Sequence, residues 1–67
     1  MTIGEKIKDA RQKKSLTQRK LAELLGYSGR GGENTVQKWE YGERPVPQNK
    51  LKPLSTILEI PLEELLP

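Results

Sequence analysis

The chain has to form a folded core from only 67 residues, none of which is cysteine. A chain of this length buries only about 60% of the surface that it exposes when unfolded, so its core is thin. Without cysteine, no disulfide or thiolate metal site adds stability. Histidine, the commonest metal ligand and general base, is absent as well. We therefore expect a single domain over residues 1–67, stabilised by aliphatic packing, with no metal site and no cofactor.

Apolar residues at the start of the chain recur with the period of a helix. Ile3 and Ile7 lie four residues apart, and Thr2 with Glu5 has the spacing of a capping box. These features predict a helix from about residue 3 to residue 13. The basic residues of this helix are expected to face solvent: Lys6, Lys8, Arg11 and Lys13.

A second helix is predicted over about residues 18–25. Thr17 is a suitable N-cap, and Gly26 lies where a left-handed residue ends a helix at little steric cost. The apolar residues of this segment are expected to form a buried stripe: Leu21, Ala22, Leu24 and Leu25.

The glycine-rich segment that follows is predicted to be a loop over residues 28–33, because glycine loses much conformational entropy in a regular element. Asn34 is a suitable N-cap, and Gln37 lies at capping-box spacing from it. A third helix would start there and end at Gly42. Its inner face would hold Val36 and Trp39, with Tyr27 and Tyr41 at the edge of the core.

Two further helices are predicted near the C-terminus. One covers about residues 48–58, with Pro53 near its first turn, where a missing amide proton matters least. A last short helix opens at Pro61, and its acidic residues suit a helix N-terminus. The expected core residues of the two are Leu51, Leu54, Ile57, Leu58, Leu62, Leu65 and Leu66. The fold class is therefore all-α, with five short helices.

Charge is distributed unevenly along the chain. The first 54 residues hold all 12 basic residues against 6 acidic ones, a net charge of +6, whereas residues 55–67 carry three acids and no base. This distribution favours one surface suited to phosphates, although an ordinary solvated surface would look similar. No segment is apolar enough for a membrane span, and the first six residues lack the apolar core of a signal peptide. We expect a cytoplasmic protein, associated with the nucleoid when it is bound to DNA.

Three stretches of the chain carry an informative order and spacing of residues. They are Leu16-Thr17-Gln18-x-x-Leu21-Ala22-x-Leu24-Leu25-Gly26-Tyr27-Ser28, Thr35-Val36-x-x-Trp39-Glu40-x-Gly42 and Leu51-x-x-Leu54-x-x-Ile57-Leu58-x-Ile60-Pro61-Leu62-x-x-Leu65. Together they resemble the helix-turn-helix domains of phage Cro proteins and repressors, also called the XRE family. The resemblance covers nearly the whole chain and implies a lambda-repressor-like domain whose second and third helices form the helix-turn-helix. It further implies binding to double-stranded DNA by a prokaryotic or phage transcriptional regulator, such as a repressor.

The chain departs from this family in the segment between Ser28 and Thr35. Six residues lie there, half of them glycine, where similar proteins have fewer. We therefore expect an insertion that enlarges the turn between helices 2 and 3, or that lies in the first turn of helix 3.

The resemblance also implies which residues contact DNA, since the third helix of such a domain enters the major groove. Candidates for base or groove contacts are Glu33, Asn34, Gln37 and Lys38. Candidates for phosphate contacts are Gln18, Arg30, Thr35, Arg44 and Lys50. Simpler roles stay open for several of them: Asn34 as an N-cap, Thr35 as a helix-start residue and Arg30 as part of a disordered loop.

A second class of function stays open beside DNA binding. An antitoxin-like or other protein-interaction module would keep this fold without reading DNA, and a flexible loop with Glu33 at the groove entrance would favour that role. An enzyme is not expected, because Glu63 and Glu64 are adjacent carboxylates with no nucleophile nearby. A homodimer on a palindromic site is implied by the resemblance, and the segment from Leu62 to Leu66 would form its contact surface or merely close the core.

Overall fold

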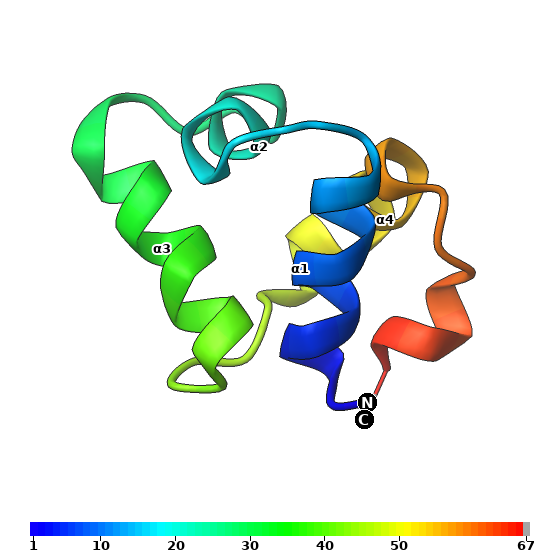
Figure 1. Ribbon diagram of the computed structural model, residues 1–67. Coiled ribbons are helices and arrows are strands. Elements are labelled where there is room, and N and C mark those ends of the chain that lie inside the picture. The colour runs from blue at the N-terminus through cyan, green and yellow to red at the C-terminus, as the bar shows by residue number, and fades with distance from the viewer. Residues whose placement is uncertain (67) are drawn as a thin grey trace.

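The computed structural model describes residues 1–66, which form four α-helices, a short 3₁₀ helix and no strand (Figure 1). The elements are α1 (Ile3–Lys13), α2 (Gln18–Leu24), α3 (Gly29–Tyr41), α4 (Gln48–Leu58) and the 3₁₀ helix η1 (Leu62–Leu65). The prediction of an all-α fold is confirmed. The short helix predicted to open at Pro61 is present as the 3₁₀ helix η1, with Pro61 as its N-cap residue.

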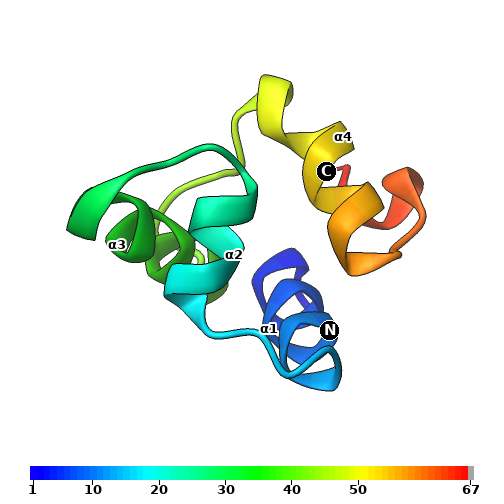
Figure 2. The same cartoon turned by 90° about the horizontal axis from the view of Figure 1, so that it is seen from above.

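Helix α1 occupies the middle of the molecule. Helices α2 and α3 pack together on one side of it, and α4 with η1 lies on the other side (Figures 1 and 2). The contact between α2 and α3 is the most extensive contact between elements. The two helices of the predicted helix-turn-helix therefore form one unit that rests on α1.

The predicted helix ends of the first half of the chain are confirmed. The Thr2 hydroxyl accepts a hydrogen bond from the Glu5 backbone N–H at 3.1 Å, and the Glu5 carboxylate accepts one from the Thr2 N–H at 2.8 Å. The bond from the Thr2 backbone N–H to the Glu5 carboxylate is the main cause that lowers the pKa of Glu5, and the Thr2 side chain lowers it further. Thr17 accepts from the Lys20 N–H at 2.9 Å, and Gly26 has a left-handed φ of 92°.

The glycine-rich segment is not a loop, which corrects the sequence interpretation. Helix α3 begins at Gly29, with Ser28 as its N-cap residue, so Asn34 lies inside the helix instead of capping it. The connection between α2 and α3 covers only residues 25–28. The inserted residues therefore lengthen α3 by about one turn at its N-terminus, and the turn is not enlarged.

Packing against α2 explains why glycine is helical here. A Cβ atom on Gly32 would lie 2.6 Å from the Tyr27 Cβ and 3.0 Å from the Ala22 Cβ, so only glycine lets α3 approach α2 this closely. This tertiary contact outweighs the low helix propensity of the segment. A Cβ atom on Gly31, one residue earlier, would have no neighbour among residues 1–66 within 4 Å.

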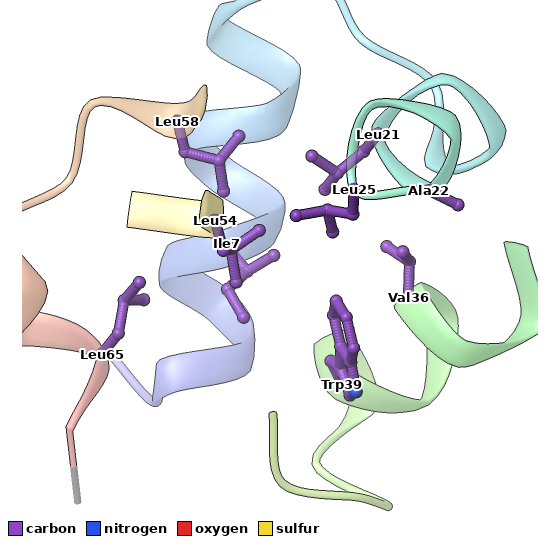
Figure 3. Close-up of a cluster of buried hydrophobic side chains, with 9 residues drawn as sticks. All are labelled: Ile7, Leu21, Ala22, Leu25, Val36, Trp39, Leu54, Leu58 and Leu65. Carbon is purple, nitrogen blue, oxygen red and sulfur yellow. The ribbon is translucent and has the colours of Figure 1, made fainter. Parts of the chain in front are cut away.

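The core lies between α1 and the helices on both sides of it (Figure 3). Trp39 is only 2% exposed and packs edge to face on Tyr27, with 6.0 Å between ring centroids, as predicted for a core tryptophan and a core-edge tyrosine. Tyr41 and Leu24 are 63% and 47% exposed, so their predicted placement in or beside the core was wrong. The buried apolar residues are Ile7, Leu21, Ala22, Leu25, Val36, Trp39, Leu54, Leu58 and Leu65.

The C-terminal half closes the core from the side opposite α3. Pro53 is the sixth residue of α4 and not part of its first turn, and Pro47 is the N-cap residue. In η1 only Leu65 is buried, whereas Leu62 and the following Leu66 are exposed. The C-terminal segment therefore closes the core through one leucine and leaves two at the surface.

A buried ion pair joins α1 to α3. Arg11 is 9% exposed, contrary to its predicted solvent position, and its Nε donates to Glu40 Oε2 at 2.6 Å. A second Arg11 nitrogen donates to Glu40 Oε1 at 3.2 Å, and a third hydrogen bond reaches the Leu16 carbonyl at 2.8 Å. The Gln18 side chain donates to the same Glu40 Oε1 at 3.1 Å, which adds α2 to the network. The three helices are thus fixed to one another at one point.

The two adjacent glycines of α3 should respond oppositely to the same substitution. Gly32→Ala should lower the free energy of unfolding by about 1–3 kcal/mol, because the methyl group overpacks the contact with α2. Gly31→Ala should raise it by about 0.5–1 kcal/mol, because alanine loses less entropy in a helix. Urea denaturation followed by circular dichroism measures both values, and equal effects of the two would contradict the assigned helix contact.

Loss of Glu40 should be severe because it leaves a buried guanidinium without its partner. We expect Glu40→Ala to lower the free energy of unfolding by about 3–5 kcal/mol, a large part of the stability of so small a domain. Glu23→Ala, which removes only exposed ion pairs, should change it by about 1 kcal/mol or less. Thermal denaturation of both variants tests this, and a Glu40 variant as stable as the Glu23 variant would exclude a structural role for the pair.

Candidate nucleic-acid interface

The outward face of α3 brings together three of the predicted DNA-contact residues. Arg30, Asn34 and Lys38 are spaced four residues apart, so they lie along one face of the helix. Arg30 and Asn34 are exposed and Lys38 is half-buried. The opposite face is buried against the rest of the domain through Gly32 and Val36. Helix α3 therefore offers a continuous row of polar side chains along its outward face.

Glu33 and Gln37, the other two base-contact candidates, lie beside this row. They are four residues apart and half-buried. The amide of Gln37 is the kind of group that pairs with adenine in the major groove, and the Glu33 carboxylate can accept a hydrogen bond from a cytosine amino group. The face thus combines donors, acceptors and cations.

Free cations are found mainly on α3 and the segment after it. Among residues 1–66, most basic side chains outside this region are in ion pairs with carboxylates, namely Lys6, Arg11, Lys13, Lys14, Arg19 and Lys20. Five basic side chains form neither an ion pair nor a side-chain hydrogen bond within residues 1–66. They are Lys8, Arg30, Lys38, Arg44 and Lys52. Three of them belong to α3 or the segment that follows it. This side of the domain therefore has the cations that phosphate neutralisation requires.

Gln18 is held in place at the first position of α2. One amide N–H of its side chain donates to buried Glu40, and the side chain is half-buried. An amide nitrogen carries two hydrogens, so the second one remains available. The site of the predicted phosphate contact is thus preorganised by the ion pair behind it.

Thr35 and Lys50 are engaged in contacts within the protein. The Thr35 hydroxyl donates to the Gly31 carbonyl of its own helix at 2.7 Å. Lys50 Nζ donates to the Leu25 carbonyl at 2.7 Å and lies 4.7 Å from the centroid of the Tyr27 ring. A cation at this position stabilises the C-terminus of α2. Both residues have structural roles that the sequence did not reveal.

Arg44 lies apart from the row on α3. It is exposed in the segment between α3 and α4, where no helix fixes its side chain. Its backbone N–H bonds to the Lys38 carbonyl at 3.4 Å, which places it just beyond the end of α3. Of the predicted phosphate contacts, Arg44 and Arg30 are thus the free cations.

The reasoning from sequence missed three residues around this surface. Arg11 and Glu40 position it from behind, and exposed Tyr41 extends it at the end of α3. A signal for Glu40 was present, since it lies four residues after Val36 and therefore on the apolar face of the helix. A charge at such a position requires a buried partner.

The described part of the chain holds neither a metal-ligand cluster nor a membrane-spanning helix. Its Asp and Glu side chains form no group of three or more that could hold a metal ion. No helix within residues 1–66 is both long enough and apolar enough to cross a membrane.

The family comparison agrees with this geometry. No curated protein and no solved structure matches the chain at a significant level. The helix-turn-helix family of Cro and C1 repressor type matches residues 7–65, which include every helix from the second turn of α1 to η1. This family consists of DNA-binding domains and is not enzymatic. With α2 and α3 packed as a helix-turn-helix on a lambda-repressor-like fold, the chain belongs to the Cro/C1-type helix-turn-helix family.

Proposed function

We propose that this domain binds specific sequences of double-stranded DNA as part of a prokaryotic or phage transcriptional regulator, with α3 in the major groove. The observation that carries the proposal is the outward face of α3, where Arg30, Asn34 and Lys38 form one row with no ion pair among the described residues. Arginine and lysine pair with guanine, and asparagine pairs with adenine, through the major-groove edges of these bases.

Helix α2 would cross the sugar-phosphate backbone in this arrangement. Its first residue, Gln18, has a second amide N–H that makes no hydrogen bond within residues 1–66, at a helix N-terminus whose dipole favours an anion. Arg44, beyond the end of α3, would contact the backbone on the other side of the groove. Phosphate contacts from both ends would fix the orientation of α3, and α3 would supply the sequence preference.

The protein-interaction alternative loses one of its two grounds. It rested on a flexible loop and an acidic residue at the entrance to the groove. The loop is a helical turn, so Glu33 alone remains, and it is half-buried at the side of the row. We therefore favour DNA binding, and the experiments below distinguish the two functions.

A homodimer belongs to the same proposal. Two domains on a palindromic site would place their α3 helices one helical turn of DNA apart. Leu62 and Leu66 are exposed on the C-terminal segment and are candidates for the contact between copies. Sedimentation of the protein with and without a palindromic duplex would show whether two copies assemble, and a stoichiometry of one copy per palindrome would contradict the dimer.

Binding should depend on salt. Among residues 1–66, the three free cations on this side are Arg30, Lys38 and Arg44, and they can neutralise at most about three phosphates per copy. A plot of log affinity against log salt should therefore fall with a slope of about −1 to −3. Fluorescence anisotropy with a labelled duplex, measured at several salt concentrations, gives this slope. A slope near zero would contradict phosphate neutralisation, and no binding at all would favour the protein-interaction function.

Lys38 should matter for affinity, whereas an equally free lysine elsewhere should not. Lys38→Ala should weaken binding to the preferred sequence by about 1–3 kcal/mol and reduce discrimination at one base pair. Lys8→Ala is the matched control, because Lys8 is exposed and unpaired within residues 1–66 but lies on α1. Equal losses in the two variants would mean that binding depends on overall charge and not on α3.

A further inference from the structure

The first turn of α3 is an addition to the helix-turn-helix, and Arg30 is its only residue with a long side chain. Its other members are Gly29, Gly31 and Gly32. Gly29 has a left-handed φ of 73° and Gly32 fits against α2, so the backbone and the packing explain these two. Gly31 has neither constraint, since its φ is not positive and a Cβ atom there would meet no atom of residues 1–66 within 4 Å. Neither the backbone conformation nor the packing of residues 1–66 therefore requires glycine at position 31, next to Arg30.

Arg30 lies in line with the candidate reading residues. It precedes Asn34 by one turn of the same face, and Asn34 precedes Lys38 by another. With a rise of about 1.5 Å per residue, the three Cα atoms are spaced roughly 6 Å apart along α3, which corresponds to about two base-pair steps. An arginine one turn before Asn34 therefore reaches a different base pair.

Two properties suit Arg30 for reading a base. Its guanidinium has no ion pair or hydrogen bond with any of residues 1–66, so its donors are free. Bidentate pairing of arginine with the O6 and N7 atoms of guanine is the commonest specific contact in the major groove. The bare backbone at Gly31 lets the helix approach the groove closely at this turn.

From these observations, and resting on the proposed DNA binding, we propose that Arg30 is a specificity-determining residue that reads a guanine about two base-pair steps from the base pair contacted by Asn34. The added turn of α3 then lengthens the half-site that each copy recognises. Arg30 acts as a base reader in this account, not as the phosphate contact that its predicted place in a loop implied.

Selection from a randomised duplex library tests this with the full chain and four variants. The wild type should enrich a motif. Asn34→Ala should lose preference at one position, and Arg30→Ala should lose preference for guanine at a separate position about two base pairs away. Arg30→Lys should retain part of the guanine preference, because lysine also reaches the guanine acceptors. Lys8→Ala, the matched surface control, should leave the motif unchanged.

Affinity measurements on the selected duplex complete the test. Arg30→Ala should bind it roughly 5- to 150-fold more weakly than the wild type does. On a duplex in which another base pair replaces that guanine, the variant and the wild type should bind with nearly equal affinity. An equal loss on both duplexes would make Arg30 a phosphate contact and overturn the inference alone. A wild-type motif that Arg30→Ala leaves intact would do the same. Failure of the wild type to enrich any motif would overturn the proposed function as well.

Discussion

The Arg11–Glu40 ion pair lies where α1, α2 and α3 meet, and it holds α3 and the Gln18 side chain in place. Burying two charges costs several kcal/mol per ion unless their hydrogen bonds are satisfied. Here Arg11 donates to both carboxylate oxygens and to the Leu16 carbonyl, and Glu40 also accepts from Gln18. No buried side-chain nitrogen or oxygen of residues 1–66 lacks a partner. A satisfied network of this kind favours a single orientation of α3 relative to α2.

The basic residues of α1 and those of α3 differ in whether they form ion pairs. The acidic C-terminal segment pairs with lysines of α1, through Lys6 with Glu64 and Lys14 with Glu59. Positive charge on that side is therefore balanced within the protein. On α3 the carboxylate of Glu40 is turned inward and bound by Arg11, so Glu33 is the one acidic side chain left beside Arg30 and Lys38 on the outer side of the helix. The net charge of the chain is +3, and its unpaired cations on the outer face of α3 attract phosphates.

Local features of the sequence were sufficient to predict most of the fold, and contacts between distant residues account for the errors. Thr2, Thr17 and Gly42 cap or end helices through bonds to residues within a few positions, so their spacing identifies them. Arg11 and Glu40 are 29 residues apart, and no local pattern links them.

The first turn of α3 is the clearest case of tertiary contact outweighing propensity. Gly29 to Gly32 have the composition of a loop, yet Gly32 packs on Ala22 and Tyr27 and fixes the segment as helix. Of the candidate contact residues, those on the outward face of α3 could be identified from helical spacing. The engagement of Lys50 could not, because its acceptor, the Leu25 carbonyl, is 25 residues away in the sequence. The bond from Thr35 to the Gly31 carbonyl is local, but it requires the helical turn that the loop prediction excluded.

The central claim is that the outward face of α3 contacts DNA, and a titration followed by NMR tests it most directly. Amide resonances of the labelled protein would be recorded as a selected duplex is added. The account predicts that the largest changes fall on Arg30, Asn34 and Lys38, with further changes at Gln18, while η1 stays unchanged. Changes confined to α4 and η1, with α3 unaffected, would contradict it.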